Sequence, residues 1–174
     1  MTWLLRMLVA LVFPACGLPG AQGLPVPPPM TLPGLHRPDS PNTALAAPAG
    51  FTPAPDIVTR AYPVPPATLY TAIRAVAAAA PRSFPQVAYD DRLQAHYVVR
   101  SKLLNFPDLV TIQVIPGPVV PGPVVPGQVT PGQGTPGSGL ILWSRSVYGR
   151  SDFGVNKARL AGWLAALDAR LATP

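Results

Sequence analysis

The chain has 174 residues, with 26 prolines, 15 glycines and a net charge of +6 that arises from 13 Lys and Arg against 7 acidic residues. That length holds one domain of ordinary size plus tails, and it excludes an assembly of several domains. The one cysteine excludes a disulfide framework. The basic balance favours anionic surroundings such as nucleic acid, anionic lipid or an acidic polymer.

The N-terminus has the layout of an export signal. One arginine precedes an apolar run from Met7 to Phe13, which is followed by small residues and turn formers and is too short for a comfortable membrane span. We predict a signal peptide over residues 1–23 with cleavage after Gly23. The competing interpretation is a lipoprotein signal ending at Cys16, and only then would lipidation hold the protein at a membrane. Both interpretations predict the periplasm or cell envelope, which disfavours a nucleic-acid partner.

Residues 24–55 are dense in Pro, Ala and Gly. Such composition buries little apolar surface and is biased toward extended polyproline II conformations. We therefore predict a disordered spacer over 24–55, followed by a single folded domain over 56–174.

Hydrophobic periodicity indicates the elements of that domain. In chain order we predict a strand over 57–62, a helix over 63–81, a hairpin over 85–102, strands over 108–115 and 140–148, and a helix over 156–171. In the second arm of the hairpin, apolar residues such as Tyr97 and Val99 alternate with His96 and Arg100, the period of a half-buried strand. The last helix has one apolar stripe, formed by Leu160, Trp163, Leu164, Leu167 and Leu171. The predicted fold is an α+β two-layer sandwich, an antiparallel sheet with two amphipathic helices.

A pentad repeat interrupts this domain over residues 115–139. Each pentad carries Pro-Gly at its second and third places, the pairing that suits a type II turn. Such a chain has little to bury and cannot offset the entropy of ordering itself. Because the repeat falls between two predicted strands, we interpret it as a long flexible Pro-Gly hairpin insertion rather than a working part of the protein.

The run before the last helix admits a structural and a functional interpretation. Gly149 and Gly154 suit left-handed turns, while Ser151, Asp152 and Asn156 suit the turn and cap of a helix N-terminus. On the functional interpretation, Arg145 and Arg150 join the free amides at the helix start in an anion site, with Trp143 on the same strand face as Arg145.

The same run carries a resemblance. Together with "SPN" at Ser40 to Asn42, the "LYTAIRAV" helix and "LLNFPDLVTIQV", the run "GRSDFGVN" resembles the uncharacterised family known as domain of unknown function 1499. Many members have a cysteine where Thr43 stands and an arginine where Val147 stands. Members often lie behind a signal peptide or a lipoprotein signal, so the resemblance implies export and a fold but no biochemical activity.

The sequence contains no convincing catalytic, metal or cofactor motif. Our first hypothesis is a non-enzymatic, exported binding or structural module with a basic site for an anionic lipid or envelope polymer, formed by Arg100, Trp143, Arg145 and Arg150. The alternative is an envelope enzyme of hydrolase type whose acid and base come from Asp90, Asp91, Asp108 or His96. These acidic residues lack the partners in sequence that acid-base or metal chemistry requires.

Overall fold

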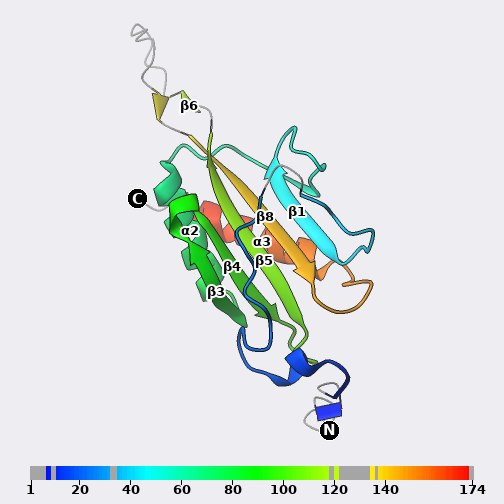
Figure 1. The fold of residues 1–174 in the computed structure, drawn as a ribbon. Helices are drawn as coiled ribbons and strands as arrows, with labels where there is room; N and C mark the ends of the chain where they lie inside the picture. Colours follow the sequence, from blue (N-terminus) through cyan, green and yellow to red (C-terminus); the bar gives the residue numbers. More distant parts are fainter. Residues whose placement is uncertain are drawn as a thin grey trace, which may run out of the picture.

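A computed structural model describes residues 7–8, 11–31, 35–117, 120–121, 134–135 and 137–172. Its centre is a six-stranded sheet in the order β2-β1-β8-β5-β4-β3 (Figure 1). The strands are β1 (Thr43–Pro48), β2 (Ile57–Thr59), β3 (Ser83–Tyr89), β4 (Gln94–Arg100), β5 (Pro107–Pro116) and β8 (Ser138–Ser146). The helices are α2 (Pro66–Ala79) and α3 (Val155–Ala172), with single 3-10 turns η1 (Pro14–Gly17) and η2 (Asp90–Arg92). This arrangement confirms the predicted α+β class.

The sheet is antiparallel at every junction except one. Strands β1 and β2 run parallel, with Ala46 opposite Ile57, whereas β1–β8, β8–β5, β5–β4 and β4–β3 are antiparallel. The connection from β1 to β2 therefore crosses over instead of turning back as a hairpin.

The main core lies between one face of the sheet and the two helices. The alternation in β4 turns Tyr97 and Val99 toward this core, and the stripe on α3 buries Leu160, Trp163 and Leu167. The Tyr97 and Trp163 rings meet edge to face, with centroids 6.2 Å apart. The periodicity of α3 thus predicted its buried face correctly, and that of β4 predicted which side chains face the helices. The prediction that β4 is half-buried is wrong, because all seven of its residues are buried.

Strand β1 lies inside the segment predicted to be a disordered spacer, so that prediction is wrong there. Residues Ala44 to Ala47 have no exposed surface and stand between β2 and β8. Alanine is depleted in strands in general, which is why the composition suggested a spacer. Between two neighbouring strands, however, small side chains pack closely on both faces, so the folded domain begins before Asp56.

The repeat connects neighbouring strands, as its position in the sequence predicts. Strands β5 and β8 pair from Asp108 opposite Ser146 to Pro116 opposite Ser138. Two short strands, β6 (Val120–Pro121) and β7 (Gly134–Thr135), pair beyond that ladder. Most of the repeat lies outside the described residues, so its flexibility stays a prediction.

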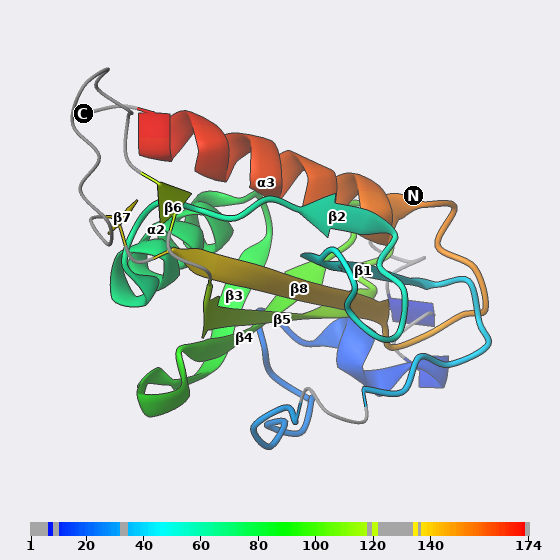
Figure 2. The ribbon, with the colours of Figure 1, turned by 90° about the horizontal axis from the view of Figure 1, so that it is seen from above.

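The N-terminal segment, residues 13–31, covers the sheet face that the helices leave open. It crosses that face in Figure 1 (blue), and Figure 2 shows it on the opposite side of the sheet from α3. Cys16, within this segment, is only 2% exposed, and the Tyr89 hydroxyl donates to the Pro27 carbonyl at 2.8 Å. Residues 24–31 therefore lie against the domain, which again corrects the predicted spacer. No helix in the described part of the chain is long and apolar enough to cross a bilayer.

Candidate functional site

A row of polar side chains lines the sheet face under the N-terminal segment. Alternation places them there from the neighbouring strands β4 and β5, opposite the helices. Five are buried, namely Gln94, His96, Arg100, Thr111 and Gln113. Buried polar groups need hydrogen-bond partners, so the chain that covers this row must supply them.

Gln94 joins this row to the N-terminal segment through its side-chain amide. Its Oε1 accepts from the Met30 N–H at 2.5 Å, and its Nε2 donates to the Met30 carbonyl at 3.1 Å and to Gln113 Oε1 at 2.5 Å. His96 continues the chain of contacts, with Nε2 at 3.2 Å from Gln94 Oε1 and Nδ1 at 3.0 Å from Thr111 Oγ1. Gln94, His96, Thr111 and Gln113 thus form one connected network, which the Met30 backbone joins.

Burial keeps His96 neutral. Desolvation, followed by the positive charge of Arg145, lowers the pKa of His96 to about 4. At neutral pH the imidazole can therefore accept a hydrogen bond at one nitrogen and donate one from the other. Its contacts fit a hydroxyl donor at Nδ1 and an amide acceptor at Nε2.

Arg100 is buried at one end of the polar row and touches only carbonyl oxygens. Nε donates to Gly20 at 2.8 Å, Nη2 to Gln22 at 3.1 Å, and Nη1 to Asn105 at 3.1 Å and to Ala15. Among the described residues no carboxylate pairs with this guanidinium. Burial, together with the nearby positive charge of Arg82, lowers the pKa of Arg100.

Asn105 and Arg82 complete the surroundings of Arg100. Asn105 Nδ2 donates to the carbonyls of Cys16 at 2.7 Å and Leu18 at 3.1 Å. Arg82 Nη2 donates to Asn105 Oδ1 at 2.5 Å, and its Nε donates to the Arg100 carbonyl at 2.9 Å. Sequence reasoning missed both residues. Asn105 could have been found from its place in the "LLNFPDL" stretch, which belongs to the family resemblance. No feature of the sequence pointed to Arg82.

Both residues have left-handed backbones, with φ of 58° at Arg82 and 60° at Asn105. Residues other than glycine seldom adopt this conformation, and such strain gathers at functional sites. Two guanidinium groups and one amide therefore converge here on a strained backbone.

Trp143 does not form a ligand groove with Arg145, although both lie on this sheet face. Trp143 is 5% exposed in a small core whose other members are Leu45, Ala47 and Ile141. Arg37 lies over the Trp143 ring, with its guanidinium carbon 5.7 Å from the ring centroid. The same guanidinium forms an ion pair with Asp56 at 2.7 Å. Arg145 is exposed. The hypothesis that Trp143 contacts a ligand is therefore wrong, because its aromatic surface is already covered.

The loop before α3 forms the predicted turn, but among the described residues no arginine pairs with Asp152 in it. Asp152 accepts from the N–H groups of Gly154 at 3.0 Å and Asn156 at 2.7 Å, and Gly149 and Gly154 have φ of 85° and 80°. None of the ion pairs among the described residues includes Asp152. Arg150 is exposed on this loop and makes none of the Arg100 contacts.

Asn156 is not the cap of α3 but a buried side chain that holds three segments together by hydrogen bonds. The helix begins one residue earlier, at Val155. Asn156 Oδ1 accepts from Ser144 Oγ at 2.5 Å and from Arg159 Nη1 at 2.5 Å, while Nδ2 donates to the Asn42 carbonyl at 2.9 Å. It thereby connects α3, β8 and the chain entering β1.

The residues of the hydrolase alternative are not brought together. Asp90 pairs with Arg74 at 2.9 Å, and Asp108 pairs with Arg159 at 2.5 Å on the helix face of the sheet. His96 lies on the other face. No group of three or more potential metal ligands occurs within the described ranges.

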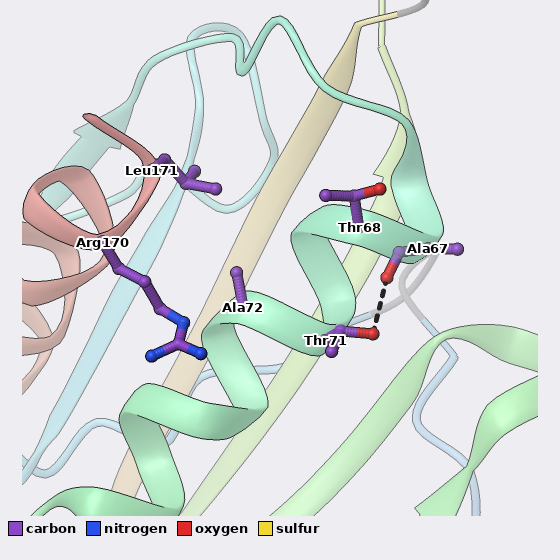
Figure 3. A pocket seen from close by; sticks show the side chains of 6 residues that line it. All are labelled: Ala67, Thr68, Thr71, Ala72, Arg170 and Leu171. Atoms are coloured by element: carbon purple, nitrogen blue, oxygen red, sulfur yellow. Dashed lines mark hydrogen bonds between the residues drawn. The ribbon is translucent and has the colours of Figure 1, made fainter. Parts of the chain in front are cut away.

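The larger hollows lie elsewhere. One, of about 480 Å³, lies between α2 and the end of α3 and is lined by Ala67, Thr68, Thr71, Ala72, Arg170 and Leu171 (Figure 3). Another, of about 560 Å³, runs between the same helices above Val99 and Trp163. A smaller one, of about 270 Å³, lies at the β3–β4 edge and includes His96. Arg100, Arg145 and Arg150 line none of these three.

Fold and site together define an α+β domain with helices on one side of its sheet and a donor-rich polar face on the other. The family model described as protein of unknown function (DUF1499) matches residues 36–167. The chain therefore belongs to the DUF1499 family, as the run before α3 suggested. Among curated proteins, none matches the chain.

Proposed function

We propose that the protein is an exported binding domain and that its polar sheet face takes an anionic group at Arg100. One observation carries the proposal. The guanidinium of Arg100 is 2% exposed, and its partners are carbonyl oxygens. A buried cation is normally paired with an anion, so an anion is the natural occupant of this site.

Removal of the predicted signal peptide would open the site. Cleavage after Gly23 takes away the carbonyls of Ala15, Gly20 and Gln22, which are three of the four that Arg100 contacts. It also takes away both carbonyls that Asn105 Nδ2 contacts. The mature site then has guanidinium and amide donors with open partners.

An oxyanion would replace those carbonyls with stronger partners. Hydrogen bonds between a guanidinium and a carboxylate or phosphate are charge-assisted and frequently bidentate. Arg82 adds a second positive charge beside Arg100 and already donates to Asn105. Phosphate and carboxylate groups of envelope lipids and polymers have the required chemistry.

The test compares the full chain with the chain that starts at Leu24, using inorganic phosphate as the probe. Phosphate should raise the melting temperature of the shorter chain and give a titratable heat of binding, because its site is open. The full chain should show neither effect. Binding should weaken with added salt.

Arg100→Gln in the shorter chain should abolish the phosphate effect, whereas Arg170→Gln, which changes an exposed arginine on α3, should preserve it. Mass spectrometry of the exported protein gives its true first residue. Equal phosphate binding by the full and shorter chains, or by Arg100→Gln, would overturn the proposal.

A further inference from the structure

The loop between β8 and α3 holds a large apolar side chain out in solvent. Phe153 is 96% exposed, and its φ is 54°. The turn that holds it is fixed by Ser151 Oγ and Asp152 Oδ1, which accept from the N–H groups of Phe153 at 3.4 Å and Gly154 at 3.0 Å. Exposure of the ring and the left-handed backbone are both unfavourable in the isolated protein, which indicates that the ring has a contact outside the chain.

The neighbours of Phe153 combine apolar and basic side chains. Val155 is 50% exposed at the start of α3. Arg150 and Lys157 are exposed on either side of these two residues. The one carboxylate in the run, Asp152, accepts backbone hydrogen bonds in the turn. We call Arg150, Phe153, Val155 and Lys157 the β8–α3 tip.

The N-terminal segment leaves the domain beside this tip. The ring of Phe13 packs against Tyr148 in the same loop, with centroids 4.8 Å apart, and against Phe106, with centroids 5.7 Å apart. Leu11 and Val12, just before it, are 80% and 70% exposed. Figure 1 shows η1 (blue) at the end of the sheet where β4 ends and β5 begins. The apolar residues Leu11 to Phe13 and the basic β8–α3 tip therefore lie at the same end of the molecule.

We propose that the β8–α3 tip docks onto a membrane surface that contains anionic lipid, with Phe153 entering the headgroup region. Apolar side chains flanked by Lys and Arg bind such surfaces through buried apolar area and attraction to anionic headgroups together. In the chain that starts at Leu24, loss of Phe13 also uncovers the rings of Tyr148 and Phe106 at this end, which adds aromatic surface beside the tip. The proposal does not depend on the Arg100 site, and a protein partner is the competing occupant.

The test is co-sedimentation of the chain that starts at Leu24 with phosphatidylcholine vesicles containing about 30% phosphatidylglycerol, a content that gives the strongly negative surface to which basic residues are attracted. Phe153→Asn should lower the partition coefficient about tenfold, because the buried ring is lost. Asparagine tolerates positive φ, so the fold should persist, which a melting curve checks. The matched control is Val58→Asn, which changes a residue that is 61% exposed on the edge strand β2 and should bind as the wild type does.

Charge is tested separately. Arg150→Gln with Lys157→Gln should weaken binding to the anionic vesicles and should leave binding to pure phosphatidylcholine unchanged. Arg100→Gln should retain vesicle binding, which distinguishes this proposal from the phosphate site. Wild-type binding by Phe153→Asn, an equal loss in Val58→Asn, or no vesicle binding at all would overturn the proposal and assign the tip to a protein partner.

Discussion

At the scale of single residues, Asp152 and Asn156 at the start of α3 have different roles, although the sequence suggested a helix cap for both. Asp152 satisfies backbone N–H groups at the helix end, whereas Asn156 satisfies side chains and a carbonyl in the interior. Water can take the place of the Asp152 carboxylate, because the helix end is partly exposed. Water cannot take the place of the Asn156 side chain, because Asn156 has no exposed surface.

This difference predicts two stability losses of unequal size. Asp152→Ala should lower the free energy of unfolding by about 0.5–2 kcal/mol, the usual cost of losing a cap. Asn156→Ala should cost more, about 2–4 kcal/mol, because it leaves several buried groups without partners. Urea denaturation measures both. Ser151→Ala, which removes one long and exposed hydrogen bond, is the control and should stay within about 0.5 kcal/mol of the wild type. Equal losses at Asp152 and Asn156 would contradict the assignment.

His96 predicts how stability depends on pH. Burial holds its pKa at about 4 in the folded protein, below the ordinary value of about 6.5. Between these two pH values the unfolded chain binds more protons than the folded protein. The contribution of neutral His96 to the free energy of unfolding is therefore fully present above about pH 6.5 and is lost as the pH falls toward about 4. The loss amounts to at most about 3 kcal/mol.

His96→Gln should flatten this part of the pH profile, because glutamine can take up hydrogen bonds in the network without titrating. Denaturation curves between about pH 7.5 and 4.5 test this over the window in which histidine titrates. His36→Gln is the matched control, since His36 is exposed, and it should follow the wild-type curve. The interpretation fails if His96→Gln loses as much stability on acidification as the wild type.

At the scale of elements, the β5–β8 ladder takes in only the outermost residues of the repeat and needs none of residues 117–137. Pro116 lies opposite Ser138, and the side chain of Ser138 donates to the Val64 carbonyl at 2.6 Å. This ladder end is therefore held to the chain before α2 by contacts that do not involve residues 117–137.

Replacing residues 117–137 with Asn-Gly should therefore keep the fold and raise the free energy of unfolding by up to about 2 kcal/mol, since a shorter loop loses less entropy on closure. Thermal and urea unfolding measure the change. A substitution of the same span by Gly-Ser of equal length is the control and should match the wild type. A marked loss of stability in the Asn-Gly variant alone would mean that the pentads pack on the domain.

At the scale of the whole molecule, the sheet has two differently built faces. The helix face is apolar and closed by α2 and α3. The other face carries the buried polar row, and its carbonyl partners come from a segment that we predict to be removed in part. Because the two coverings are independent, loss of residues 1–23 exposes donors around Arg100 while the main core stays intact. This independence is what makes a binding role for the polar face physically reasonable.

The sequence by itself determined the features that depend on local periodicity. The stripe on α3, the alternation in β4, the α+β class and the position of the repeat between paired strands all follow from spacings within one segment. The sequence also placed His96 and Arg100 on the polar face. The family resemblance rested on the run around Asp152, which is equally local.

Only the tertiary structure decided which distant segments meet. Alanine-rich β1 has no strand signal of its own and becomes a strand because β2 and β8 flank it. Trp143 is buried with Leu45 beneath Arg37, and three of the four carbonyl partners of Arg100 come from residues 15–22. Hydrogen-bond partners and packing neighbours far apart in the chain leave no period in the sequence, since each is selected by the geometry of the whole sheet. For this reason the strands and helices of the domain could be predicted in outline, whereas the cluster of Arg82, Arg100 and Asn105 could not.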